Sequence, residues 1–140
     1  MRYVLDCSVA LKWFFQEPLS DVATRLLEQL QRGDAELVAP DCIVAELGHS
    51  CRKLVLGRKL SAEESYAAIE EFASLPIALV PSRVLARQAM ELAIQHLGTF
   101  YDALYIALAE RESLKVITAD DRMANAFARI DRTLALADFE

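Results

Sequence analysis

The sequence predicts a single α/β domain of three layers, in which helices cover both faces of a parallel β-sheet. Short apolar runs alternate along the chain with longer stretches of helical periodicity, which is the pattern of repeated βα units. The runs lack an alternation of polar and apolar residues, as expected of strands buried on both faces. The chain has 140 residues, of which 54% are hydrophobic, and we expect residues 1–140 to share one core.

The expected strands and helices follow one another along the whole chain. We expect strands at Tyr3–Leu5, Leu37–Ala39, Ile77–Val80, Val116–Ile117 and Leu134–Leu136. We expect helices near residues 8–15, 18–32, 41–56, 62–73, 82–96, 100–112 and 121–128. Several helix ends carry their own signals: Ser61-Ala62-Glu63-Glu64 fits a capping box, and Gly33 and Gly57 follow basic last turns.

Charge and cysteine content restrict the class of function. The net charge of −6 has the wrong sign for a protein whose whole surface attracts nucleic acid, so any such contact requires a local basic patch. The three cysteines, Cys7, Cys42 and Cys51, fit neither a disulfide framework nor a zinc ribbon, and we expect them to be small buried residues. No apolar run approaches the roughly 18 residues of a membrane span, and the charged N-terminus does not resemble a signal peptide. We therefore expect a cytoplasmic protein with no membrane partner.

Two acidic residues stand at the ends of expected strands. Asp6 ends the first apolar run, and Asp120 follows the fourth. Because ligands of open parallel sheets bind beyond the carboxyl ends of the strands, these carboxylates converge if their strands are neighbours. Taken singly, each residue also suits a turn or a helix N-cap, where Asp is favoured.

Two further acids lie in helices. Asp102 belongs to the segment Thr99–Ala109, which is apolar around nearly its full circumference and is therefore expected to be buried. An alternative role for Asp102 is a capping box with Thr99, which is compatible with one oxygen being offered to a metal. Glu46 lies at the border of an apolar helical stripe, where it either points into a cleft or stays solvated.

A cluster of these four carboxylates predicts a hard divalent cation, because like charges packed together need a neutralising partner. An all-oxygen site suits Mg²⁺, with Mn²⁺ as a substitute. Such an ion can polarise a phosphodiester and activate a water. Ser8 and Thr118 each lie two residues from one of the acids. They could hold waters or a phosphate, or serve only as a helix cap and a strand end.

Four segments in order carry a family resemblance: Asp6–Phe14, Pro40–Glu46, Tyr101–Ala109 and Val116–Arg122. With them the sequence resembles the PIN-domain nucleases, specifically the VapC-type toxins of toxin-antitoxin pairs. The resemblance implies a central five-stranded parallel sheet, metal-dependent endoribonuclease activity, a homodimer, and a small cognate antitoxin of a type II system as partner. It places the family's acids on Asp6, Glu46, Asp102 and Asp120 and its hydroxyls on Ser8 and Thr118. Asp121 is the second choice for the fourth acid, because only Asp120 completes Thr-x-Asp.

Residues for RNA contact are less clearly marked. Lys12, Arg52, Lys53 and Arg122 lie near the segments of the expected site and could bind phosphates, or they could be solvated side chains that balance local acids. The aromatic run Trp13–Phe15 could stack on bases, but such a run is more often part of a core or a dimer interface.

Two alternatives to a nuclease remain. One is a non-catalytic PIN-like module that binds RNA or a protein partner and uses its acids as caps and in ion pairs. The other is phosphoryl transfer through an aspartyl phosphate on Asp6. The second is disfavoured by Ser8, which stands where hydrolases of the haloacid dehalogenase type have a second Asp.

Overall fold

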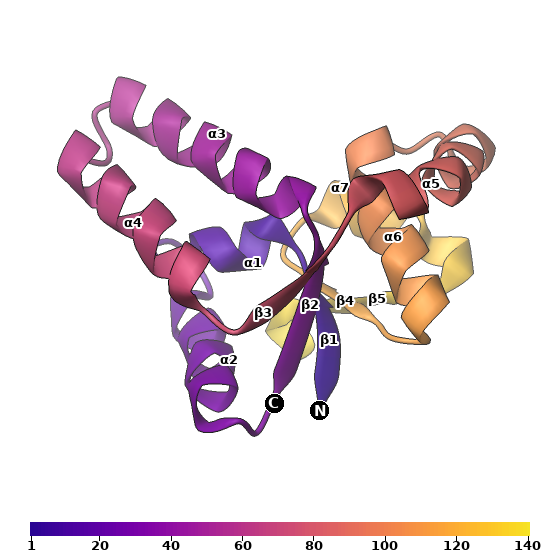
Figure 1. Cartoon of the computed structure of the whole chain (residues 1–140), viewed down its shortest axis with the longest axis horizontal. Coiled ribbons are helices and arrows are strands. Elements are labelled where there is room, and N and C mark those ends of the chain that lie inside the picture. The colour runs from indigo at the N-terminus through magenta and orange to yellow at the C-terminus, as the bar shows by residue number, and fades with distance from the viewer.

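A five-stranded, all-parallel sheet lies at the centre of the computed structural model, which describes residues 1–140 (Figure 1). Its strand order is β3-β2-β1-β4-β5. The strands are β1 (Arg2–Leu5), β2 (Glu36–Pro40), β3 (Ile77–Val80), β4 (Val116–Thr118) and β5 (Thr133–Ala135). The three-layer α/β/α prediction with five parallel strands is confirmed.

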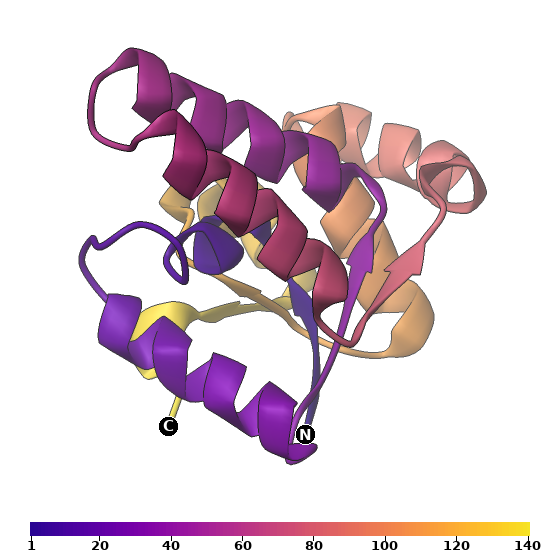
Figure 2. The ribbon, with the colours of Figure 1, turned by 60° about the vertical axis from the view of Figure 1, so that its left-hand side comes forward.

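Helices connect every pair of successive strands. They are α1 (Cys7–Leu11), α2 (Ser20–Arg32), α3 (Cys42–Leu56), α4 (Ala62–Ser74), α5 (Ser82–His96), α6 (Phe100–Glu112) and α7 (Asp121–Ala126), with 3₁₀ turns η1 (Ala128–Ile130) and η2 (Leu136–Asp138). Figures 1 and 2 show α1 to α4 on one side of the sheet and α5 to α7 on the other. Right-handed crossovers require this division, because the chain steps from β1 to β3 in one direction and from β3 to β5 in the other.

Helices on both faces explain why the strands read as continuous apolar runs. Val4, Leu5, Val116 and Ile117 are fully buried, and they belong to one core cluster of 35 residues. Because helices cover both faces of these central strands, the sheet can present side chains to a ligand only where the strands end.

The helix ends confirm the boundaries predicted at Gly33, Gly57 and Ser61. Ser61 and Glu64 form both bonds of the capping box, at 3.0 and 3.1 Å. Gly33 ends α2 with a φ of 80°, a left-handed conformation that glycine adopts without steric cost. Gly57 follows α3, but the left-handed residue after that helix is Arg58.

Some predicted boundaries were wrong. The helix expected at 8–15 ends at Leu11 and continues only as turns, and α2 begins at Ser20 because Leu19 is left-handed, with a φ of 68°. Near the C-terminus, Leu136 starts η2 rather than ending β5. These breaks depend on backbone conformations at single residues, which an apolar period does not encode.

The topological switch point of the sheet lies between β1 and β4. From β1 the chain moves outward through β2, whereas from β4 it moves outward through β5. The two strands pair in register, with Leu5 opposite Ile117, so that Asp6 and Thr118 follow side by side at the carboxyl edge. In open α/β sheets this crevice is the usual ligand site. No helix of the chain is both long and apolar enough to cross a bilayer.

Candidate active site

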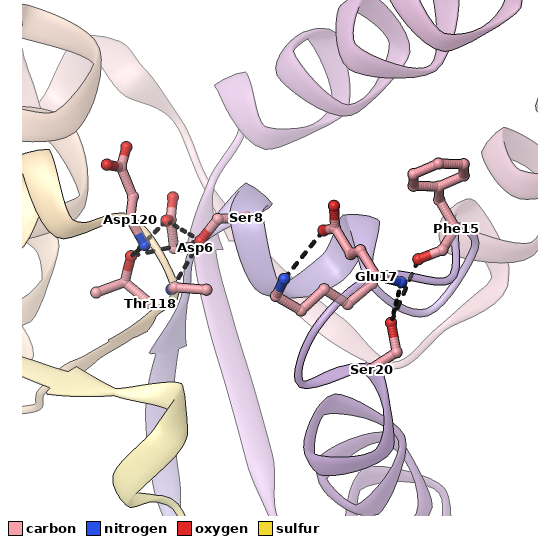
Figure 3. Close-up of polar contacts among 9 residues, drawn as sticks. Asp6, Ser8, Phe15, Glu17, Ser20, Thr118 and Asp120 are labelled. Atoms are coloured by element: carbon pink, nitrogen blue, oxygen red, sulfur yellow. Dashed lines mark hydrogen bonds and ion pairs between the residues drawn. The ribbon is translucent and has the colours of Figure 1, made fainter. Parts of the chain in front are cut away.

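Asp6 is held at the switch point by two hydroxyl groups. Ser8 and Thr118 donate to Oδ2 of Asp6 at 2.6 and 2.7 Å. Each hydroxyl also accepts a backbone N–H of the turn after β4: Ser8 from Ala119 and Thr118 from Asp120, both at 2.9 Å (Figure 3). Ser8 therefore lies inside α1 and does not cap it, and it ties the ends of β1 and β4 together through Asp6.

Asp120 combines a capping role with a place in the same cluster. Its Oδ1 accepts the backbone N–H of Arg122 at 2.9 Å, which caps α7 as expected. Figure 3 shows its carboxylate standing beside that of Asp6. The bond to Arg122 falls on one oxygen, so the other oxygen of Asp120 remains available to a ligand.

Glu46 reaches the site from α3 and is held by two donors. The hydroxyl of Tyr105, on α6, and the thiol of Cys42, one turn earlier on α3, both donate to Oε1, at 3.3 and 3.4 Å. Burial raises the pKa of the Tyr105 phenol, and burial together with the Glu46 charge raises the pKa of Cys42 to about 12, so both groups keep their protons. Oε2 of Glu46 takes no hydrogen bond from either group.

Asp102 lies in the first turn of α6. Thr99 accepts the backbone N–H of Asp102 at 3.0 Å and caps the helix, but the return bond of a capping box does not form. All residues from Ala103 to Ala109 are buried, which confirms the prediction of a buried helix. The Asp102 carboxylate is thus directed by a helix that cannot shift without disturbing the core.

The four predicted acids line one pocket. Its volume is about 250 Å³, and its walls are Asp6, Cys7, Ser8, Leu11, Glu46, Ser50, Asp102 and Asp120. Asp121 is exposed and is not part of the lining, so the geometry favours Asp120 as the fourth acid. No three acidic, histidine or cysteine side chains are drawn together tightly enough to form a complete metal-binding group by themselves.

Burial and the repulsion of neighbouring charges make Asp6, Glu46 and Asp102 reluctant to ionise. The pKa of Asp6 is raised mainly by burial and further by the charge of Asp120, against the hydrogen bonds of Ser8 and Thr118. Burial, with the charges of Asp6 and Asp102, raises the pKa of Glu46 to about 7. Burial, with the charges of Asp6 and Asp120, raises that of Asp102 to about 6. The four carboxylates therefore form one electrostatically coupled cluster that favours a cation.

The sequence model of the PIN domain family matches residues 3–132, nearly the whole of this fold. The chain belongs to the PIN domain family. The resemblance drawn from four sequence segments is thereby confirmed.

Individual relatives of this PIN domain are VapC proteins. It is 36% identical over 90 residues to ribonuclease VapC1 of Mycobacterium tuberculosis, a match that spans 63% of this chain and 65% of VapC1. It is 30% identical over 123 residues to ribonuclease VapC12 of the same species, covering 88% of this chain and 90% of VapC12.

Two solved structures share the fold. The VapBC2 structure from Rickettsia felis aligns with a TM-score of 0.66 at 18% identity, covering 96% of this chain and 97% of that chain. A toxin-antitoxin complex from Klebsiella pneumoniae aligns with a TM-score of 0.63 at 15% identity, with the same coverage. At such identities the likeness concerns the fold.

The basic residues singled out for RNA contact have different surroundings in this PIN domain. Lys12 is paired with Glu17 at 3.0 Å, and its side chain is only 10% exposed, so it is an internal ion pair rather than a free phosphate ligand (Figure 3). Arg52 lines a separate groove between α3 and α4, and Lys53 is exposed on α3. Arg122 is exposed, and its charge lowers the pKa of Asp102, so it alone of the four is coupled to the acidic pocket.

The aromatic run after α1 contributes to the core. Trp13 is partly buried and donates its indole N–H to the carbonyl of Ala23 at 2.8 Å, and Phe14 packs edge-on against it. This contact ties the turns after α1 to α2. Stacking of RNA bases on Trp13 is therefore not supported.

Sequence reasoning missed three residues of the site, although helical spacing could have found them. Tyr105 is three residues after Asp102, Ser50 is four after Glu46, and Cys42 is four before it. Positions three or four apart share a helix face, so each lies on the face of an acid already identified. The spacing does not predict that the Tyr105 hydroxyl, on α6, bonds to Glu46 on α3.

Proposed function

We propose that this PIN domain is a magnesium-dependent endoribonuclease and the toxin of a type II toxin-antitoxin pair. The observation that carries the proposal is the single pocket in which Asp6, Glu46, Asp102 and Asp120 meet at the switch point of the sheet. The names of VapC1 and VapC12 as ribonucleases support the same activity.

The donor set fits a hard divalent cation. Every polar side chain around the four acids presents oxygen except the thiol of Cys7, whose pKa is raised by burial and by Asp6, so that it stays protonated. The hydrogen bonds from Ser8 and Thr118 share one oxygen of Asp6, and those on Glu46 share Oε1. Asp6, Glu46 and Asp120, whose Oδ1 accepts from Arg122, are thus each anchored through one oxygen and offer the other. Mg²⁺ typically needs only one or two carboxylates and keeps several waters, so a complete protein cage is unnecessary.

The side chains then have separate tasks in hydrolysis. A bound Mg²⁺ or Mn²⁺ supplies Lewis acidity toward the phosphodiester and an activated water. Carboxylates of the acidic pocket, drawn from Asp6, Glu46, Asp102 and Asp120, would hold the cation. The hydroxyls of Ser8 and Thr118 keep Asp6 in place. Glu46, which reaches the pocket from α3, would also orient a water there.

Partners of two kinds are proposed. An antitoxin is supported by the neighbouring toxin-antitoxin complex from Klebsiella pneumoniae. A second copy of the chain is supported by Met90, Ile94 and Leu97 on and after α5, which share one helix stripe and are 49%, 68% and 91% exposed. Substituting Ile94→Glu should convert a dimer to a monomer in light scattering. An unchanged mass would exclude this face.

The nuclease proposal is tested with purified protein and structured RNA, with and without Mg²⁺ or Mn²⁺. Cleavage should require the metal, and Asp6→Ala or Asp102→Ala should reduce it by at least about 100-fold while the fold is retained. The matched control is Asp34→Ala, an exposed acid between α2 and β2, which should leave the rate unchanged. Equal cleavage by wild type and Asp6→Ala would point to a contaminant and sink the proposal. RNA binding without cleavage would favour the non-catalytic module.

A further inference from the structure

A second hollow continues from the acidic pocket between α3 and α6. It has a volume of about 560 Å³ and is lined by Ala45, Glu46, His49, Ser50 and Tyr101. Glu46 and Ser50 also line the acidic pocket, so the two spaces share a wall. We call this space the Tyr101 hollow. Its size lies within the range of about 300–1,000 Å³ of sites that hold small organic groups.

Tyr101 has the features of a stacking surface. It directly precedes Asp102 on the first turn of α6, and it is 62% exposed although it is a large aromatic residue. Its hydroxyl takes part in no hydrogen bond within the chain, in contrast to the buried Tyr105. The Tyr101 ring therefore lies next to Asp102, is exposed, and makes no hydrogen bond that holds the fold together.

The charges around the hollow select a base rather than a phosphate. None of the five lining residues is Lys or Arg, and Glu46 places a carboxylate in the wall. A phosphate there would meet like charge, whereas a neutral planar base would not. Glu46, His49 and Ser50 supply donors and acceptors at the edge of such a ring. Aromatic side chains are the usual platforms for unpaired bases in single-stranded RNA.

We propose that the Tyr101 hollow binds the nucleobase next to the cleaved phosphodiester, stacked on the Tyr101 ring, and that it contributes to the choice of cleavage site. This inference rests on the proposed nuclease function, since it assigns a subsite to the substrate of the acidic pocket.

The test compares Tyr101→Ala, Tyr101→Phe and Tyr66→Ala. Tyr66 lies on α4 and is 59% exposed, so it is a matched exposed tyrosine outside both spaces. Cleavage ends are first mapped in a pool of RNAs with Mn²⁺, and a short RNA containing the preferred site is then used. Tyr101→Ala should raise KM roughly 5- to 100-fold, with a smaller effect on kcat, and weaken the base preference at one position beside the cut. Tyr101→Phe, which keeps the ring, and Tyr66→Ala should resemble wild type.

Binding without metal gives an independent readout. In EDTA, the same RNA carrying 2-aminopurine at that position should lose fluorescence on wild type and Tyr101→Phe but not on Tyr101→Ala, with all variants melting at the same temperature. If wild type cleaves RNA and Tyr101→Ala matches Tyr66→Ala in both assays, the subsite is wrong while the nuclease function stands. If Tyr101→Ala weakens only inhibition by the antitoxin, the hollow belongs to the antitoxin and the proposal fails. Failure of wild type to cleave RNA overturns the proposed function itself.

Discussion

The hydroxyl of Tyr105 donates to Oε1 of Glu46 over 3.3 Å and so joins α6 to α3 across the acidic pocket. Tyr105 is fully buried and Glu46 is partly buried, so this bond fixes a carboxylate of the acidic pocket to α6, in which Ala103 to Ala109 are all buried. It is one of the two hydrogen bonds that hold Oε1 of Glu46, the other coming from Cys42.

We predict that Tyr105→Phe lowers the rate of RNA cleavage or the affinity for Mn²⁺ about 10- to 100-fold, as is usual when the partner of a metal-site carboxylate is removed. The ring remains, so the melting temperature should change by only a few degrees. Mn²⁺ affinity is measured by calorimetry and cleavage by initial rates. Tyr66→Phe, an exposed control, should have no effect. Wild-type values for Tyr105→Phe would show that Cys42 alone suffices to hold Glu46.

The raised carboxyl pKa values predict an unusual pH dependence of stability for the metal-free protein. The pKa is raised from 4.5 to about 7 for Glu46 and from 3.8 to about 6 for Asp102. For each residue, at a pH between its unfolded and its folded pKa, the folded state binds more protons than the unfolded state does. Stability should therefore increase as pH falls through this window and be lost as pH rises. We expect the melting temperature in EDTA to be several degrees higher at about pH 5.5 than at about pH 8.

Metal should reverse this trend, because a cation competes with protons for the same carboxylates. With saturating Mg²⁺, the protein should melt at a higher temperature at about pH 8 than the metal-free form does. Asp6→Asn removes a buried charge and should flatten the pH dependence in EDTA. A melting temperature that falls on acidification from pH 8 to 5.5 in EDTA would contradict the coupled cluster.

Asp120 and Asp121 can be separated by substitution with Asn. Asn is as good an N-cap as Asp, so Asp120→Asn keeps the bond to the Arg122 N–H and removes only the charge. We expect it to reduce cleavage at least about 100-fold with a melting temperature close to that of wild type. Asp121→Asn, which changes an exposed residue outside the pocket, should retain most activity. The reverse order of effects would assign the fourth acid to Asp121.

Lys12 and Arg122 should behave differently although the sequence suggested phosphate binding for both. Lys12→Ala leaves Glu17 without its partner in a half-buried pair, and we expect a loss of about 1–3 kcal/mol in the free energy of unfolding by urea, with an unchanged KM. Arg122→Gln should weaken RNA binding and reduce the slope of log affinity against log salt by about one, with unchanged stability. A reduced salt slope for Lys12→Ala would show that the ion pair opens to bind RNA.

Much of this protein could be predicted from its sequence. Apolar periods located all the strands and helices to within a few residues, because burial on one or both sides leaves a local signature. The strand ends marked Asp6 and Asp120, and the apolar helix around Asp102 marked an acid in an improbable place. Capping of α4 and the glycine end of α2 were also local, since each depends on residues within one turn.

Tertiary structure alone decided which residues meet. The sequence did not reveal that Tyr105 bonds to Glu46, that Lys12 is committed to Glu17, or that Tyr101 borders a second hollow. Tyr105 and Glu46 are 59 residues apart, and their contact depends on how α3 and α6, which cover opposite faces of the sheet, come together at the carboxyl ends of its strands. Periodicity records which face of an element is buried, but the partner on the other side is set by long-range packing, for which neither residue carries a local signal.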